Sequence, residues 1–186
     1  MNSKKIIFIT GGARSGKSSF ALQLANNYEG VHGGDAIPPM RKAYIATAEA
    51  LDEEMKERIE KHKRQRGDDW VTYEEPIKIS DVLKTIEGRY RVVVIDCLTL
   101  WLSNLMKAGL NIEAEIGHFI SSLVTCYSSL IFIVSNEVGM GIVPENEMAR
   151  RFRDMAGILN QKMAEISDEV FMVVAGIPIK IMDKRA

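Results

Sequence analysis

The sequence predicts an α/β protein, with a mostly parallel β-sheet flanked by helices. Short apolar runs rich in β-branched residues alternate along the chain with longer stretches of helical periodicity. This alternation is typical of a parallel sheet whose faces are covered by helices. The first apolar run leads directly into a glycine-rich segment, and a helical pattern follows at once. A strand, a turn and a helix in this order form the unit from which such folds are built.

The composition bounds the class of protein. The chain has 186 residues, 46% of them hydrophobic and 26% charged, which predicts a single domain over residues 1–186. The net charge is −1 and no basic stretch carries interleaved aromatic residues, so we expect no nucleic-acid partner. The N-terminal apolar run is too short for a signal core and no later run approaches the length of a membrane span, which predicts a cytoplasmic protein. Cys97 and Cys126 lie in apolar stretches and are expected to be buried, reduced thiols.

The individual elements follow from the periodicity. The stretch from 29 to 42 has paired glycines and prolines without apolar periodicity, which predicts an exposed loop. A helix from about Pro144 to Ile166 carries one apolar stripe, expected to be a core face: Met148, Phe152, Met155, Leu159, Met163 and Ile166. The expected strands are Lys5–Thr10, Ala43–Thr47, Val92–Asp96, Leu130–Ser135 and Val170–Ala175. The other expected helices are Ser18–Tyr28, 51–66 and Leu98–Met106.

Residues 11 to 18, Gly-Gly-Ala-Arg-Ser-Gly-Lys-Ser, satisfy the Walker A pattern of a P-loop. Glycines let backbone N–H groups approach phosphate oxygens, and the following helix adds its positive N-terminal dipole. We predict that Lys17 reaches the β- and γ-phosphates and that Ser18 gives its hydroxyl to Mg²⁺. The predicted nucleotide-binding residues of this segment are Gly11, Gly12, Ala13, Arg14, Ser15, Gly16, Lys17 and Ser18.

Asp96 ends a hydrophobic strand, as a Walker B acid does. A carboxylate in this place lies beside the P-loop at the carboxyl end of a parallel sheet, where it can bind the metal ion. An aspartate after a strand is also a common N-cap, so Asp96 can serve the helix that begins at Leu98. The two roles are compatible.

His62 lies near the end of the predicted helix over residues 51–66. It continues the apolar stripe of Leu51, Met55 and Ile59, so it should face inward or toward a cleft. The cations after it could hold a triphosphate while the imidazole attacks phosphorus. Taken by itself, however, a histidine that ends such a stripe is more often a packed or interface residue, and a basic last turn is ordinary capping.

The stretch from 135 to 146 follows the fourth expected strand and contains Gly139 and Gly141. Loops after strands line the ligand crevice of open α/β sheets, and glycine-rich loops are equally common as plain connections. Both interpretations of this loop stay open.

These segments together resemble one enzyme family, the bifunctional adenosylcobinamide kinase/adenosylcobinamide-phosphate guanylyltransferase. The resemblance covers nearly the whole chain, with its blocks in the family's order. Those blocks are the P-loop, Tyr-Ile-Ala-Thr-Ala at 44–48, Asp-Glu-Glu-Met at 52–55, Arg58-Ile59-x-x-His62, Asp-Cys-Leu-Thr at 96–99, and Asn-Glu-Val-Gly-Met-Gly-Ile-Val-Pro-Glu-Asn at 136–146. The 29–42 loop is longer than in the family, and the tail from 182 to 186 has no counterpart there.

The resemblance implies two reactions. The aminopropanol hydroxyl of adenosylcobinamide is phosphorylated by ATP or GTP, and GMP is then transferred from GTP to that phosphate, giving adenosylcobinamide-GDP. In this view His62 and Lys17 are catalytic, and His62 carries the guanylyl group between two displacements. The resemblance also implies a RecA-like P-loop fold and a homotrimer. It carries further nucleotide-binding positions over to Ala46, Thr47, Ala48, Lys63, Arg64, Gln65, Arg66, Glu74 and Asp96.

Two other functions stay open. One is a P-loop kinase of another small alcohol, in which His62 is only structural. The other is a RecA-like assembly module that uses nucleotide hydrolysis to change its conformation. The low net charge disfavours a nucleic-acid partner for such a module.

Overall fold

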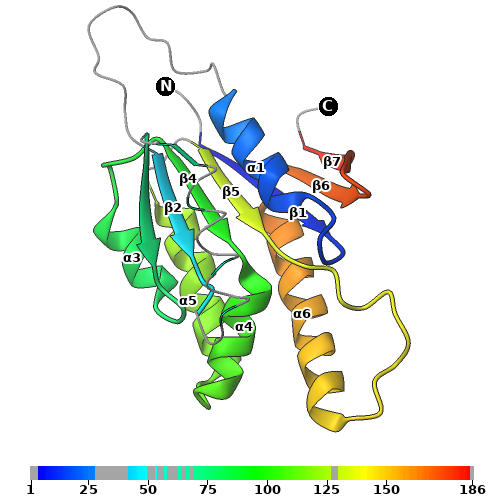
Figure 1. Ribbon diagram of the computed structural model, residues 1–186. Coiled ribbons are helices and arrows are strands. Elements are labelled where there is room, and N and C mark those ends of the chain that lie inside the picture. The colour runs from blue at the N-terminus through cyan, green and yellow to red at the C-terminus, as the bar shows by residue number, and fades with distance from the viewer. Residues whose placement is uncertain are drawn as a thin grey trace, which may run out of the picture.

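A seven-stranded sheet forms the centre of the protein in the computed structural model (Figure 1). The structure describes residues 4–27, 42–49, 53, 57, 63, 66–67, 69–126 and 130–184. Within them the strands lie in the order β3-β2-β4-β5-β1-β6-β7, and all pairs are parallel except the antiparallel pair of β6 and β7. The strands are β1 (Lys5–Gly11), β2 (Lys42–Ala46), β3 (Trp70–Glu74), β4 (Val92–Asp96), β5 (Leu130–Val134), β6 (Glu169–Val174) and β7 (Ile177–Asp183).

Helices cover both faces of this sheet. One face packs against α1, and the other packs against α3, α4, α5 and α6. Alternate residues of β1 show the division, because Ile7 and Ile9 belong to the core under α1 whereas Ile6 and Phe8 belong to the core on the other side. The helices are α1 (Lys17–Asn26), α3 (Ile79–Thr85), α4 (Leu98–Lys107), α5 (Ile112–Thr125) and α6 (Glu147–Ile166).

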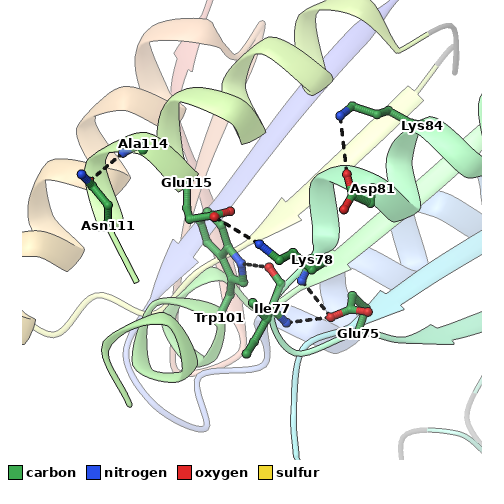
Figure 2. A network of polar contacts seen from close by, with 9 residues as sticks. All are labelled: Glu75, Ile77, Lys78, Asp81, Lys84, Trp101, Asn111, Ala114 and Glu115. Carbon is green, nitrogen blue, oxygen red and sulfur yellow. Dashed lines mark hydrogen bonds and ion pairs between the residues drawn. The ribbon is translucent and has the colours of Figure 1, made fainter. Parts of the chain in front are cut away.

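Polar contacts join three helices on that second face (Figure 2). The side chain of Glu75 accepts the backbone N–H groups of Ile77 and Lys78, at 2.9 and 2.7 Å, and so fixes the start of α3. Lys78 in turn lies 3.3 Å from Glu115 of α5. The fully buried Trp101 of α4 donates its indole N–H to the carbonyl of Ile77 at 2.8 Å. These contacts fix the chain that follows β3 against α4 and α5.

The structure confirms the mostly parallel sheet and extends it by two strands, β3 and β7, that the periodicity did not predict. The first turn of the long helix also differs from the prediction. Asn146 is the N-cap of α6, since its side-chain oxygen accepts the N–H of Ala149 at 3.2 Å, so the helix begins at Glu147 and not at Pro144. Met148 on the predicted core stripe is 72% exposed, whereas Leu159 and Met163 farther along are fully buried. Figure 1 gives the reason: the first turns of α6 extend beyond the sheet.

Other predictions fall wholly or partly outside the described residues. This holds for 29–41 of the expected loop and for most of the expected helix over 51–66, of which Glu53, Glu57 and Lys63 are described and helical. Cys97 and Cys126 are both buried and are not joined in a disulfide, as expected. Within the described part of the chain, no helix has the length and apolar character needed to cross a bilayer.

Candidate nucleotide site

The P-loop has the backbone that phosphate binding requires. Gly16 stands at the N-cap of α1 with φ 98°, and Gly11 has φ 146°, both conformations that side-chain-bearing residues rarely adopt. No side chain caps α1, and its first turn contains no acidic residue. The first N–H groups of the helix therefore stay available to an anion, and the helix dipole favours one.

Lys17 is held against this loop. Its side chain is almost completely buried, with 6% of the residue exposed, and its ammonium group donates to the carbonyl of Gly12 and lies 3.4 Å from Oγ of Ser15. The positive charge therefore lies within the curve of the loop, where a phosphate would enter. Ser18, the next residue, is half-buried in the first turn of α1.

Three predicted site residues form one row across the carboxyl ends of neighbouring strands. Ala46 of β2 pairs with Glu74 of β3 on one side and with Asp96 of β4 on the other. Asp96 pairs with Val134 of β5, which in turn pairs with Ile9, two residues before the P-loop. β5 thus lies between the P-loop strand and β4. With strands about 4.8 Å apart, Asp96 stands roughly 10 Å from the P-loop strand at the same edge of the sheet.

The Asp96 carboxylate has a buried partner that the sequence did not reveal. The hydroxyl of Tyr44 donates to Oδ2 of Asp96 at 2.6 Å, and the guanidinium of Arg66 lies 3.9 Å from the centroid of the Tyr44 ring. Burial and the neighbouring Asp96 raise the pKa of the Tyr44 hydroxyl well above its usual value, so Tyr44 keeps its proton and remains a donor. Burial likewise raises the pKa of the Cys97 thiol to about 12, and Asp96 adds to that rise.

Thr47 fixes the turn that follows Asp96. It is fully buried, its hydroxyl donates to the carbonyl of Cys97 at 2.7 Å, and the same oxygen accepts the N–H of Cys97 at 2.8 Å. Its own N–H donates to the carbonyl of Asp96 at 3.1 Å, and its carbonyl accepts from the side chain of Asn104 at 2.9 Å. Each backbone and side-chain polar atom of Thr47 thus has a partner inside the protein.

Ser18 and Asp96 fit a magnesium ion by the chemistry of their donors. Hydroxyl and carboxylate oxygens are the ligands Mg²⁺ takes, and this ion usually keeps several waters and substrate phosphates. In the described residues, no group of three or more His, Cys, Asp or Glu could hold a metal by itself. An ion at this edge would therefore take its remaining ligands from the nucleotide and from water.

Some of the remaining predicted residues lie in the described part of the chain and others lie outside it. Lys63 forms an ion pair with Glu74 at the β3 end of the row, and Ala48 is half-buried just after Thr47. His62, Arg64 and Gln65 lie outside the described residues. Ala13 and Arg14 are exposed on the P-loop, and Arg14 has the positive φ of 57°.

The P-loop also has a neighbour from the far end of the chain. The turn between β6 and β7 lies against it, with the N–H of Gly176 donating to the carbonyl of Ser15 at 2.9 Å. Ala175 and Gly176 both have positive φ, 51° and 81°, as a two-residue hairpin turn requires. An Ala-Gly pair between two apolar runs was the only signal of this hairpin in the sequence.

Comparison with known proteins gives concordant matches. The model of the family described as cobinamide kinase / cobinamide phosphate guanyltransferase matches residues 7–181. The bifunctional adenosylcobalamin biosynthesis protein CobP of Pseudomonas aeruginosa is 41% identical over 93% of this chain and 95% of its own length. The CobU proteins of the same description from Escherichia coli and Salmonella typhimurium are 37% and 39% identical, each over 95% of this chain and 99% of their own length.

A solved structure, that of the RadB recombinase, superposes with a TM-score of 0.51. It covers 90% of this chain and 73% of the recombinase, at 14% identity, and so shows that the fold is the RecA-like one. The family model matches nearly the full length of the chain, and the relatives are 37 to 41% identical to it. The chain therefore belongs to the cobinamide kinase / cobinamide phosphate guanyltransferase family.

Proposed function

We propose that this enzyme phosphorylates adenosylcobinamide with a nucleoside triphosphate and then transfers GMP from GTP to the resulting phosphate. The observation that carries the proposal is the P-loop: a glycine-lined turn, an uncapped helix N-terminus and the buried ammonium of Lys17 gathered at the carboxyl edge of a parallel sheet. Family membership supplies the corrinoid substrate and the two reactions. It favours this function over a kinase of another alcohol or an assembly module.

In the first reaction the P-loop amides and Lys17 hold the triphosphate. The acceptor hydroxyl oxygen attacks the γ-phosphorus, the bond from that phosphorus to the bridging oxygen breaks, and a nucleoside diphosphate leaves. Charge spreads over the phosphate oxygens as the bonds change, and fixed N–H groups and an ammonium stabilise that charge. Ser18 and Asp96 would hold Mg²⁺, which supplies further neutralisation of the phosphate charge when it is bound.

In the second reaction we assign the nucleophile to His62. A ring nitrogen of neutral His62 attacks the α-phosphorus of GTP, and pyrophosphate leaves. The phosphate of adenosylcobinamide phosphate then displaces the histidine and takes the GMP. We propose that Lys63, Arg64, Gln65 and Arg66, with Ala46, Thr47, Ala48, Glu74 and Asp96, complete the nucleotide site.

Labelling of the protein by GTP tests the second reaction. Incubation with α-labelled GTP should give one covalent label that is lost in acid and kept in alkali, as expected of a phosphoramidate. His62→Ala should abolish the label, while His118→Ala, which changes an exposed histidine on α5, should label as the parent does. A His62→Ala protein that labels like the parent would contradict the assignment.

Three further properties belong to the proposal. We propose a homotrimer, on the resemblance of the sequence to the family, so that the helix carrying His62 could complete a site near a neighbouring subunit. A single domain over residues 1–186 and a cytoplasmic location stay predictions.

A further inference from the structure

Glu137 lies directly beside the P-loop. β5 pairs in parallel with β1, and the pairing continues past the strand ends, where the N–H of Ser135 donates to the carbonyl of Ile9 at 3.0 Å. Two residues later the N–H of Glu137 donates to the carbonyl of Gly11 at 2.9 Å. The first glycine of the phosphate cradle and an acidic residue are therefore joined by one hydrogen bond.

Helices on the second face of the sheet hold this segment in place. The hydroxyl of Thr99, at the start of α4, accepts the N–H of Asn136 at 2.6 Å and lies 3.2 Å from the hydroxyl of Ser135. The side-chain amide of Asn160 on α6 donates to the carbonyl of Asn136 at 3.1 Å. Ser135 is 1% exposed and Asn136 and Glu137 are half-buried, so the chain is fixed up to the acidic residue and reaches solvent after it.

The carboxylate of Glu137 is itself oriented. Its Oε1 accepts the N–H of Gly139 at 2.6 Å, and a Cβ on Gly139 would come within 3.0 Å of that oxygen. The short loop after the strand therefore sets the direction of the carboxylate. An amide in place of the carboxylate would keep this bond, because its oxygen is also an acceptor.

An exposed apolar loop begins at the next residue. Val138, Met140, Ile142 and Val143 are all solvent-exposed, Met140 at 76% and Ile142 at 97%. Exposed apolar side chains on one segment mark interaction sites, of which ligand-binding surfaces are one kind. Glu137 thus lies between a phosphate cradle and an apolar surface, where the donor nucleotide and a large, partly apolar acceptor would meet.

We propose that Glu137 is the general base of the phosphorylation step, an inference that rests on the proposed kinase activity. The carboxylate accepts the proton of the acceptor hydroxyl while the oxygen of that hydroxyl bonds to the γ-phosphorus. The bond between the γ-phosphorus and the bridging oxygen breaks, and the nucleoside diphosphate leaves with the electron pair. The protonated Glu137 then releases its proton to water, so the carboxylate is regenerated at each turnover.

Asp96 and Glu74 are the acidic residues of the predicted site, and both have other partners. Asp96 accepts the Tyr44 hydroxyl and stands two strands from β1. Glu74 pairs with Lys63 and stands four strands from β1. The acceptor hydroxyl must meet the γ-phosphate at the P-loop, and Glu137 is bonded to that loop.

The test separates the two reactions in one protein. Phosphorylation is followed with γ-labelled ATP and γ-labelled GTP and adenosylcobinamide, and guanylylation with α-labelled GTP and preformed adenosylcobinamide phosphate. Glu137→Gln should lower kcat of phosphorylation about 100-fold or more, the usual contribution of a general base, with KM values and guanylylation within about threefold of the parent. Glu87→Gln, which changes an exposed acid after α3, serves as the control and should leave both reactions unchanged.

A second variant checks the proton transfer directly. Glu137→Ala should lose phosphorylation to a similar extent, and added formate should restore part of the rate, whereas Glu137→Gln should not respond. A Glu137→Gln enzyme that phosphorylates at the parent rate, or one that loses both reactions equally, would overturn the inference. A parent enzyme that does not phosphorylate adenosylcobinamide would instead contradict the proposed function.

Discussion

Thr47 shows how a residue can belong to a nucleotide site through its contacts with another residue. The resemblance assigned it to nucleotide binding, and the structure places its hydroxyl against both the N–H and the carbonyl of Cys97. Since Cys97 follows Asp96, these bonds fix the direction in which the Asp96 carboxylate leaves the strand. The side chain of Thr47 therefore positions the acid.

Replacement of Thr47 tests this role. Thr47→Val keeps the shape of the side chain but leaves the buried N–H of Cys97 without its acceptor, which should cost about 1–3 kcal/mol in the free energy of unfolding. It should also raise the Mg²⁺ concentration for half-maximal phosphorylation by about tenfold, because a misdirected Asp96 carboxylate should lose about 1.4 kcal/mol of metal-binding free energy, which corresponds to a factor of 10. Urea unfolding and Mg²⁺ titration measure the two effects.

Thr47→Ser retains the hydroxyl and is the matched control. It should keep the Mg²⁺ requirement within about threefold of the parent, since only a methyl group is lost. A Thr47→Val enzyme that is less stable but has the parent's Mg²⁺ requirement would limit Thr47 to a structural role.

For single residues, the sequence predicted which residues belong to the site better than it predicted their hydrogen-bond partners. The P-loop and Asp96 were predictable because a local pattern, a strand followed by glycines or by an acid, carries the signal. Tyr44 gave no such signal. Its bond to Asp96 joins residues 52 positions apart in sequence and depends on β2 lying beside β4. Binding of nucleotide by these residues stays a prediction.

The strands differ in how well their pattern predicted them. β1, β4 and β5 are buried on both faces and appear as continuous apolar runs. β3 at one edge is only partly buried, and its sequence, Trp-Val-Thr-Tyr-Glu, has strand-forming residues without a continuous apolar run. β7 at the other edge contains Pro178, which weakens a strand prediction and is tolerated at an edge.

The contact between β1 and β6 makes Gly11 a sensitive position. A Cβ there would lie 2.3 Å from the carbonyl oxygen of Val173 on β6, and the φ of 146° is strained for alanine. Gly11→Ala should therefore lower the free energy of unfolding by about 2 kcal/mol or more in the absence of nucleotide, since the strained backbone alone costs on the order of 1–3 kcal/mol. Denaturant unfolding measures the change.

Gly12→Ala is the comparison for this prediction. The adjacent position has nothing within 4 Å of an added Cβ and no positive φ, so its stability should change by less than about 1 kcal/mol. Equal losses in the two variants would show that the approach of β6 to the P-loop is not tight.

The mass of the whole molecule in solution tests the proposed homotrimer. A single chain has a mass of 20.8 kDa, and the trimer should give three times that mass by light scattering coupled to size-exclusion chromatography. The sequence offered no physical signal for the proposed trimer, because contacts between subunits generally leave no local periodicity. A monomeric mass across a range of protein concentrations would contradict the trimer.

The hydrogen bond from Gly176 to Ser15 has a consequence for the order of events during synthesis. The P-loop is synthesised well before β5 and β6, which lie on either side of β1, and before the turn that holds Ser15. At about 5–20 residues per second, that interval is on the order of ten seconds or more. Until then the nascent chain lacks the two strands and the turn that support its P-loop, so nucleotide cannot assist folding before they are made. Cellular GTP and ATP meet a formed site only after the turn at Gly176 has been made.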